Sequence, residues 1–307
     1  MNKLAFIFPG QGSQKIGMGK DFYEGTEIGK NIFDKASEAV GLDLKELCFE
    51  ENDRINITEY TQICLLTASI AMMEVVKENG IKPDITAGLS LGEYSALVTA
   101  GAVQFEDAAR VVRQRGIFMQ EEVPAGKGAM AAVLGLDSEV ISQIIKDWEN
   151  VQIANYNCPG QIVISGETES VKAAAEKLKE AGAKRCLMLN VSGPFHSELL
   201  RGAGDKLSRV LSDVTVKDLQ IPYVSNTTAQ IITDKEMIKP LLIKQVYNSV
   251  RWEQSIRVMI REGVDVFIEI GPGKTLAGFN KKIDKEIKTY NIESLSDIDK
   301  VREELSC

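Results

Sequence analysis

The stretch ITAGLSLGEYSALVTAG, residues 85–101, carries the sharpest structural signal in the chain. Its first five residues form a short apolar run, which predicts the end of a buried strand. The residues from Glu93 to Ala100 favour a helix, and Gly101 stands where a helix C-cap belongs. The sequence GLSLG at 88–92 therefore lies on a sharp turn from a strand into a helix, an arrangement typical of α/β folds.

Ser90, at the centre of that turn, is a candidate nucleophile. The glycines two residues before and after it allow the strand and the helix to pass closely. The start of the helix would direct free N–H groups and the positive end of its dipole toward an oxyanion formed beside Ser90. The G-x-S-x-G pattern alone is weak in a chain with 25 glycines, so a structural glycine turn is the alternative interpretation.

Composition narrows the class of protein. With 307 residues, 44% of them hydrophobic and 26% charged, the chain is typical of a soluble globular protein with one large domain or two smaller ones. A net charge of −8 argues against a nucleic-acid partner, because such a partner requires a basic face. An anionic ligand would need a local cluster of Lys and Arg.

The chain shows no sequence sign of a membrane span or of an oxidising compartment. The longest apolar run, 63–73, is shorter than the about 18 residues that a span needs, and the run 4–8 is too short for a signal-peptide core. Five cysteines without C-x-x-C or metal-ligand spacing indicate reduced thiols. We therefore expect a cytoplasmic protein without a membrane partner and without a metal site.

A glycine-rich loop follows the first predicted strand. Residues 4–9, LAFIFP, predict a buried strand that runs directly into GQGSQ at 10–14. The exposed backbone N–H groups of such a loop can bind a phosphate or an oxyanion, although a flexible connector is the alternative. The loop lacks the Lys-Ser/Thr pair of a P-loop and the third glycine of a dinucleotide-binding fingerprint.

The segment FEDAARVVRQRGIFMQEE at 105–122 predicts an amphipathic helix with a buried arginine. Its apolar stripe runs through Ala108, Val111 and Met119 at helical spacing, and Arg115 falls within that stripe. An inward-facing arginine must meet an anion, because an unpaired buried charge is very costly. Two interpretations stay open: a structural salt bridge with a core Asp or Glu, or a fork that binds the carboxylate of a ligand.

A change of pattern between about 127 and 191 predicts an inserted unit. The predicted elements are a strand at 129–134, a helix at 138–148, strands at 151–156 and 161–165, a helix at 169–181 and a strand at 185–191. The order βαββαβ is that of the ferredoxin-like split unit. We therefore expect an α/β protein in which residues 1–126 and 192–307 form a large subdomain with a parallel sheet. Residues 127–191 would form the small subdomain.

His196, in SGPFHS at 192–197, is the only histidine. If an imidazole activates Ser90, His196 must supply it. It follows a Gly-Pro turn at a predicted helix start, where the helix dipole would keep the ring neutral. No aspartate stands out as a third member, and a backbone carbonyl would orient the ring without neutralising an imidazolium. A purely structural histidine is the alternative interpretation.

Eight motifs resemble, in sequence and in order, those of the malonyl-CoA:acyl carrier protein transacylases, the stand-alone acyltransferases of bacterial-type fatty acid synthesis. They are FPGQGSQ (8–14), SLGEYSAL (90–97), QRG-x-x-MQE (114–121), GAMAAV (128–133), NYNCPGQIVISG (155–166), GPFHS (193–197), YNSVRW (247–252) and GPGKTL (271–276). The resemblance covers nearly the whole chain. It implies a hydrolase-like α/β large subdomain that carries a ferredoxin-like small one, in agreement with the patterns above.

The resemblance also implies roles for individual residues. Ser90 is similar to the acyl-accepting nucleophile, and His196 is similar to the general base. The backbone N–H groups of Gln11 and Leu91 resemble the oxyanion hole, and Arg115 resembles the anchor for the free carboxylate of malonate. Further site residues implied in this way are Met119, Asn155 and Phe195, which would bind substrate, and Arg251, whose carbonyl would orient the histidine.

The reaction that the resemblance implies is a two-step ping-pong transfer. Malonyl-CoA would acylate Ser90, and the phosphopantetheine thiol of acyl carrier protein would then accept the malonyl group. No cofactor is implied, since the coenzyme A thioester is the substrate, and we expect a monomer. Because both partners are anionic, we expect a local basic rim. The candidates for that rim are Lys184, Arg185, Arg201 and Lys274.

Two positions depart from the family pattern. Leu89 precedes the nucleophile where the family usually carries histidine, so the polar contact of that histidine is missing. Ser249 stands where the family usually carries proline, which leaves the turn before Arg251 less rigid.

Three rival functions stay open. A serine esterase or thioesterase would share Ser90 and His196 but deliver the acyl group to water; the inward Arg115 and the lack of a triad acid argue against it. A non-enzymatic binder of carrier proteins would not react through Ser90. A discrete polyketide acyltransferase would share every motif.

Overall fold

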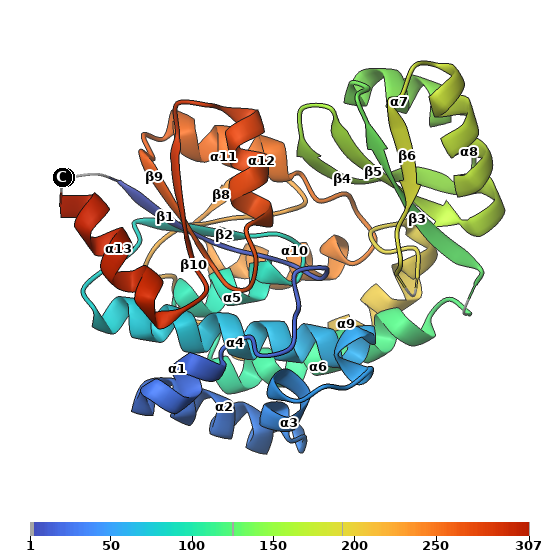
Figure 1. The fold of residues 1–307 in the computed structure, drawn as a ribbon. Coiled ribbons are helices and arrows are strands. Elements are labelled where there is room, and N and C mark those ends of the chain that lie inside the picture. The colour runs from blue at the N-terminus through green and yellow to red at the C-terminus, as the bar shows by residue number, and fades with distance from the viewer. Residues whose placement is uncertain (1–2, 125, 192, 307) are drawn as a thin grey trace.

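Two β-sheets organise the chain in the computed structural model, which describes residues 3–124, 126–191 and 193–306 (Figure 1). The large sheet has the strand order β10-β9-β1-β2-β7-β8. Its strands are β1 (Leu4–Phe8), β2 (Ile85–Gly88), β7 (Tyr223–Val224), β8 (Ile231–Ile232), β9 (Val266–Ile270) and β10 (Lys288–Ile292). All neighbours in it are parallel except β7 and β8, which pair antiparallel.

Strand β1 shows why this sheet is buried on both faces. Phe6 and Phe8 belong to one apolar cluster, whereas Ala5 and Ile7 belong to a second cluster on the opposite face. Alternate side chains of a strand point to opposite faces, so a continuous apolar run needs helices on both sides. The sequence LAFIF is therefore that of a strand buried on both faces, and in the structure β1 lies between β2 and β9.

The helices cover the two faces of the large sheet (Figure 1). Helix α4 (Thr58–Glu78) is buried along most of its length and packs against α2 (Glu27–Val40) and α6 (Phe105–Glu121). Helices α11 (Trp252–Arg261) and α12 (Thr275–Ile283) contribute apolar side chains to the cluster on the other face. The remaining helices of the large part are α1 (Lys20–Gly25), α3 (Leu44–Phe49), α5 (Gly92–Thr99), α9 (Arg201–Ser212), α10 (Ile238–Gln245) and α13 (Leu295–Ser306), with short 3-10 turns η1 (Arg54–Asn56), η2 (Glu198–Leu200) and η3 (Lys235–Met237).

The smaller sheet is antiparallel, with the order β4-β5-β3-β6. Its strands are β3 (Gly128–Leu134), β4 (Val151–Cys158), β5 (Gln161–Glu167) and β6 (Arg185–Met188), and its helices are α7 (Ser138–Ile145) and α8 (Thr168–Glu180). The chain order β3-α7-β4-β5-α8-β6 is the predicted βαββαβ unit. The α/β fold class, with a parallel-rich sheet and a separate antiparallel sheet, is thus confirmed. The predicted subdomain limits stay predictions, and Ser192 at one of them lies outside the described residues.

Three predicted elements differ in extent from the structure. The last strand of the small sheet ends at Met188 rather than at 191, because the N–H of Val191 bonds the carbonyl of Leu189 and bends the chain. The helix expected from 197 begins as η2 and becomes α-helical only at Arg201. The apolar segment at 221–225 predicts a strand, and the structure limits this strand to Tyr223 and Val224.

Hydrogen bonds join the small sheet to the large part of the molecule along β4. The main chains of Ala154 and Tyr156 each bond Val250, at 2.8 Å, in an isolated parallel bridge. Ser249 adds a bond from its hydroxyl to the carbonyl of Ile153 at 2.5 Å. The hydroxyl of Ser249 thus restrains the turn at the position where the family pattern has proline. None of the helices within the described ranges is long and apolar enough to cross a membrane.

Candidate active site

Ser90 lies on the turn between β2 and α5, with a left-handed backbone at φ 51°. The turn leaves no room for side chains at its two glycines. A Cβ on Gly88 would lie 1.9 Å from the backbone of Gly92, and a Cβ on Gly92 would lie 2.2 Å from the carbonyl oxygen of Phe8. The two glycines are therefore required by close packing of strand and helix, as the sequence pattern predicts.

Ser90 and His196 form a hydrogen-bonded pair. The Oγ of Ser90 lies 2.7 Å from Nε2 of His196, and Nδ1 of His196 lies 2.7 Å from the carbonyl oxygen of Gln245. A carbonyl oxygen only accepts hydrogen bonds, so in the neutral ring Nδ1 carries the proton. Nε2 is then the acceptor, and it is placed to take the proton of the Ser90 hydroxyl.

The carbonyl that orients His196 is not the predicted one. Sequence resemblance assigned it to Arg251, and that assignment is wrong. The carbonyl oxygen of Arg251 accepts hydrogen bonds from the N–H of Ser255 at 3.0 Å and from its hydroxyl at 2.8 Å. Arg251 is the N-cap of α11, so its carbonyl is used in the first turn of that helix. The carbonyl of Gln245, at the end of α10, takes the role instead.

Burial keeps His196 neutral. His196 is 3% exposed, and its pKa is lowered to about 4, mainly by desolvation and in addition by the positive charge of Arg115. The hydrogen bonds with the Gln245 and Asn248 backbones oppose this shift. The helix predicted to begin after His196 starts as a three-residue 3-10 turn at Glu198.

Arg115 is buried beside Ser90 and is held by neutral groups. Its Nη1 donates to Oε1 of Gln62 at 2.7 Å, and its Nη2 donates to Oε1 of Gln245 at 2.9 Å and to Oγ of Ser90 at 3.3 Å. Within the described ranges, its hydrogen bonds go to neutral oxygens, and no ion pair with an Asp or Glu side chain is among them. The structural salt bridge left open by the sequence is therefore absent from this part of the chain. The buried guanidinium retains capacity for an anion in the pocket.

A pocket of about 210 Å³ lies between the two sheets and joins these groups. Its wall is mostly apolar, which strengthens electrostatic interactions inside it. The predicted site residues that line it are Gln11, Ser90, Leu91, Arg115, Met119, Asn155, Phe195 and His196. Arg251 is not among its lining residues, whereas Gln62, Asn157 and Phe279 line it without having been predicted.

Gln11 and Leu91, whose backbone N–H groups are predicted to form an oxyanion hole, both line the same pocket. Neither Gln11 nor Leu91 donates its N–H to another residue in the part of the chain that the structure describes. The side chain of Gln11 is held elsewhere, by a bond from Nε2 to the hydroxyl of Thr58 at 3.0 Å. A Cβ on Gly10 would lie 2.5 Å from the carbonyl oxygen of Leu89, so this loop lies directly on the serine turn.

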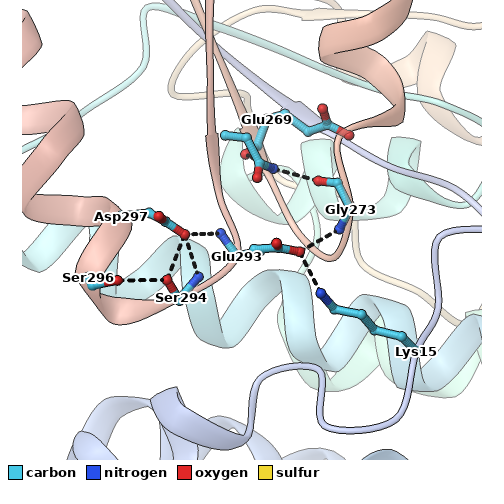
Figure 2. A network of polar contacts seen from close by, with 8 residues as sticks. Lys15, Glu269, Gly273, Glu293, Ser294, Ser296 and Asp297 are labelled. Atoms are coloured by element: carbon cyan, nitrogen blue, oxygen red, sulfur yellow. Dashed lines mark hydrogen bonds and ion pairs between the residues drawn. The ribbon is translucent and has the colours of Figure 1, made fainter.

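A second set of contacts holds the loop at 10–15 against the loop at 271–274 (Figure 2). One oxygen of Glu293 accepts both from Nζ of Lys15 at 2.8 Å and from the N–H of Gly273 at 2.9 Å. The buried carboxylate of Glu269 accepts from the N–H groups of Leu276 and Ala277 at the start of α12. Leu276 lines the pocket, so these contacts fix one of its walls.

Three polar residues around the serine turn have no counterpart in the sequence-based prediction. Glu93 is fully buried, and its Oε2 accepts from Nε2 of Gln245 at 2.7 Å and from the N–H of Asn226 at 3.3 Å. Desolvation raises the pKa of Glu93 to about 7, while its hydrogen bonds from Gln245 and Asn226 lower it. In the sequence, Glu93 could have been noticed only through its position close to Ser90. No sequence pattern points to Asn226 or Gln245.

Acidic neighbours partly neutralise the positive charge of the expected basic rim. Arg201 pairs with Glu198 at 2.6 Å and lies over the ring of Tyr247. Lys274 is the N-cap of α12, next to the wall described above, and Arg185 begins β6. Across the described residues, no group of three or more His, Cys, Asp or Glu side chains is placed to hold a metal ion.

Comparisons with known proteins agree with this arrangement. A family described as acyl transferase domain matches residues 5–296. The malonyl CoA-acyl carrier protein transacylase of Bacillus subtilis (strain 168) is 52% identical over 297 residues, which make up 95% of this chain and 94% of that protein. A crystal structure of the malonyl CoA-acyl carrier protein transacylase from Clostridium perfringens has a TM-score of 0.96 at 43% identity, covering 99% of this chain and 97% of that one.

One solved relative includes a carrier protein. It is described as a type II PKS acyl-carrier protein in complex with its malonyl-transacylase. This chain is 40% identical to it with a TM-score of 0.95, over 98% of this chain and 99% of that one. The likeness to both solved structures also confirms the predicted fold class.

Proposed function

Because the chain belongs to the acyl transferase family, among the malonyl CoA-acyl carrier protein transacylases, we propose that it transfers a malonyl group from malonyl-CoA to acyl carrier protein. The observation that carries the proposal is the placement of three groups in one apolar pocket. The Oγ of Ser90 lies 2.7 Å from Nε2 of His196 and 3.3 Å from Nη2 of Arg115. A nucleophile, a base and a buried cation are what transfer of a malonyl group requires.

In the first step, the Oγ of Ser90 attacks the thioester carbonyl of malonyl-CoA while Nε2 of His196 takes the hydroxyl proton. The proton on Nδ1 stays on the ring, bonded to the carbonyl of Gln245. The N–H groups of Gln11 and Leu91 stabilise the oxyanion of the tetrahedral intermediate. The C–S bond then breaks, and His196 returns its proton to the departing thiolate of coenzyme A.

The second step runs in the opposite sense. The phosphopantetheine thiol of acyl carrier protein gives its proton to His196 and attacks the malonyl-serine carbonyl. The C–O bond to Ser90 breaks, and Oγ recovers the proton from His196. A thioester of coenzyme A becomes an ester of Ser90 and then a thioester of the carrier protein, so no atom changes oxidation state and the route needs no redox cofactor.

Arg115 selects the acyl group in this proposal. Its guanidinium is 1% exposed and has neutral hydrogen-bond acceptors only, so a carboxylate in the pocket would be its first anionic partner by direct contact. The fork of the guanidinium can hold a carboxylate with two parallel hydrogen bonds. An acetyl group offers no such carboxylate and leaves the cation unpaired.

A polyketide pathway is a second candidate for the same chemistry. The relative solved with a type II PKS acyl-carrier protein has a TM-score of 0.95, against 0.96 for the transacylase from Clostridium perfringens. Comparing kcat/KM for a fatty-acid carrier protein and a polyketide carrier protein, both loaded with phosphopantetheine, distinguishes the two pathways. We also propose a cytoplasmic location, since Cys48, Cys64, Cys158 and Cys186 are all free thiols.

The test of the proposal is intact-mass measurement after mixing the protein with malonyl-CoA. We expect the mass to increase by one malonyl group, located on Ser90 by peptide mapping, and to return to the original value when acyl carrier protein with its phosphopantetheine arm is added. The Ser90→Ala variant should gain no mass. Acylation that persists in this variant would place the nucleophile elsewhere, and loss of the acyl group to water without carrier protein would identify a thioesterase.

A further inference from the structure

Glu93 is a buried carboxylate without a part in the steps above. It lies three residues after Ser90, in the first turn of α5, and none of its side chain is exposed. Burying a carboxylate costs free energy, which its hydrogen bonds must offset. Its Oε2 accepts from two residues, Gln245 and Asn226, and each of these contacts Ser90 directly.

We propose that Glu93 is a positioning residue for acyl transfer, which orients Gln245 and thereby fixes Ser90, His196 and Arg115 relative to one another. The inference rests on the proposed function, because it assigns these residues the roles given above.

Gln245 contacts all three functional residues Ser90, His196 and Arg115. Its Oε1 accepts from Nη2 of Arg115 at 2.9 Å, and its main-chain oxygen accepts from Nδ1 of His196 at 2.7 Å. Its Nε2 donates to the carbonyl of Ser90 at 2.8 Å and to Oε2 of Glu93 at 2.7 Å. Both amide hydrogens of Gln245 are thus used, and so is its side-chain oxygen.

The contact with Glu93 determines which way the Gln245 amide faces. In the observed orientation, the NH₂ group points toward the carboxylate of Glu93 and the oxygen points toward Arg115. A reversed amide would bring its oxygen against the carboxylate and its NH₂ against the guanidinium, and both contacts would be repulsive. Without an acceptor at position 93, only Arg115 and the Ser90 carbonyl would resist that reversal.

Glu93 also supports the strained serine turn through Asn226. The Oδ1 of Asn226 accepts from the N–H of Ser90 at 2.6 Å, and its Nδ2 donates to the carbonyl of Gly88 at 2.7 Å. The main-chain N–H of Asn226 donates to Glu93 at 3.3 Å. The N–H and the carbonyl of Ser90 are therefore both held by residues that bond one oxygen of Glu93, which stabilises the left-handed backbone at Ser90.

The separation of Glu93 from Arg115 keeps the guanidinium fork open. Glu93 and Arg115 contact opposite atoms of the Gln245 amide, which lies between them. A direct ion pair would occupy the guanidinium fork and compete with the carboxylate of a substrate. An acceptor one side chain away orients Gln245 and still leaves Arg115 available to a ligand.

The experiment compares three substitutions at Glu93 with the wild-type enzyme. Glu93→Gln keeps an oxygen acceptor for Gln245 and Asn226, Glu93→Leu removes it, and Glu93→Asp keeps the charge but withdraws the acceptor by one methylene. The matched control is Thr99→Val on the same helix, which removes the buried bond from the Thr99 hydroxyl to the carbonyl of Ser95. The readouts are kcat/KM for malonyl-CoA and for acetyl-CoA, thermal stability, and the rate of Ser90 labelling by a fluorophosphonate.

We expect Glu93→Leu and Glu93→Asp to lower malonyl kcat/KM on the order of 10²-fold, because buried donors lose their acceptor. The ratio of malonyl to acetyl kcat/KM should fall at least tenfold, since Arg115 is no longer held, and labelling should slow. Glu93→Gln should stay within about tenfold of wild type in every rate. Thr99→Val should keep the wild-type ratio and rates.

Three results would overturn the inference. The first is a wild-type malonyl-to-acetyl ratio in Glu93→Asp or Glu93→Leu, whatever their stability. The second is an equal loss in Glu93→Gln and Glu93→Leu, which would make the acceptor irrelevant. The third is wild-type labelling of Ser90 in Glu93→Asp. If the wild-type protein is labelled by the fluorophosphonate but not acylated by malonyl-CoA, the proposed function fails, and the labelling rates still decide the role of Glu93.

Discussion

The Nε2 atom of His196 lies 2.7 Å from the Oγ of Ser90, although 106 positions separate the two residues in the chain. Both residues have a left-handed backbone, with φ 51° at Ser90 and φ 58° at His196. Such conformations cost about 1–3 kcal/mol each for a residue other than glycine, and they persist only where the surroundings hold them. The pair is therefore a product of tertiary structure, and its geometry depends on β2, α10 and the loop before η2 together.

Replacing His196 by alanine should slow malonyl transfer by about 10²–10⁴, the usual contribution of a general base. Because the pKa of His196 is lowered to about 4, the base stays unprotonated well below pH 6.5. The wild-type acylation rate should thus be level from neutral pH to about 5 and fall near pH 4. Single-turnover acylation measured from pH 4 to 8 tests this; an identical pH profile in the variant would remove His196 from the mechanism.

His196 should also make the folded state sensitive to acid. Its pKa is lowered from 6.5 to about 4 on folding, so the unfolded chain binds one more proton between these values. The stability it contributes is complete above pH 6.5 and is lost as the pH falls toward 4. From these pKa values, wild type should lose about 2 kcal/mol through this group between pH 7.5 and 5.

Urea unfolding of wild type and of His196→Gln at the two pH values measures that loss by difference. The comparison is needed because Glu93 and Glu269 change the free energy of unfolding with pH in the opposite direction. Burial raises both of their pKa values to about 7, so these carboxyls favour the folded state below pH 4.5 and lose that contribution as the pH rises through 7. Equal acid sensitivity in wild type and His196→Gln would contradict a buried neutral histidine.

Replacing Arg115 by alanine should abolish the preference for malonyl-CoA. Losing one member of a desolvated charge pair costs on the order of 3–5 kcal/mol, or about 10²–10⁴ in selectivity. Malonyl transfer should fall by that amount while acetyl transfer is kept or rises. Competition assays with mixed acyl-CoAs provide the measurement.

The control for Arg115 is Arg113→Ala, on the same helix. Arg113 forms an ion pair with Glu59 at 2.7 Å and is not a lining residue of the pocket. The Arg113→Ala variant should leave the ratio of malonyl transfer to acetyl transfer unchanged. An equal decrease of both substrates in Arg115→Ala would show that Arg115 has a structural role only.

Introducing histidine at position 89 should change transfer tenfold or less and leave the protein folded. Leu89 lines the pocket, and the family pattern accommodates histidine at this position. Steady-state kinetics with malonyl-CoA, together with thermal unfolding, would detect the effect. A change of several orders of magnitude in either direction would contradict a merely modulating role for this residue.

The fold was predictable where apolar periodicity is strong. The runs at 4–9 and 85–89 correspond to β1 and β2, and the stripe through Arg115 corresponds to α6 with its arginine buried. The short strands β7 and β8 have two residues each, too few for any periodicity to identify. Strand β10, KTYNI, is only partly buried and mixes polar with apolar residues, so its sequence does not distinguish it from a loop.

The site was predictable where side-chain chemistry is rare and not where the main chain acts. A single histidine and one G-x-S-x-G leave few choices for His196 and Ser90. The carbonyl that orients the ring belongs to Gln245, and any residue has a carbonyl, so sequence could not separate Gln245 from Arg251. Glu93 and Asn226 meet only after β2, α5 and β7 have packed, because they are 133 positions apart in the chain.

The central position of β1 has a consequence for how the protein is made. β1 contains residues 4–8, yet one of its two partners is β9, whose residues 266–270 are synthesised much later. One edge of β1 therefore stays unpaired on the ribosome until β9 has emerged. An open strand edge invites pairing with other chains. A product truncated before Gln245 also lacks the carbonyl that orients His196, so incomplete synthesis yields an aggregation-prone chain rather than a partial enzyme.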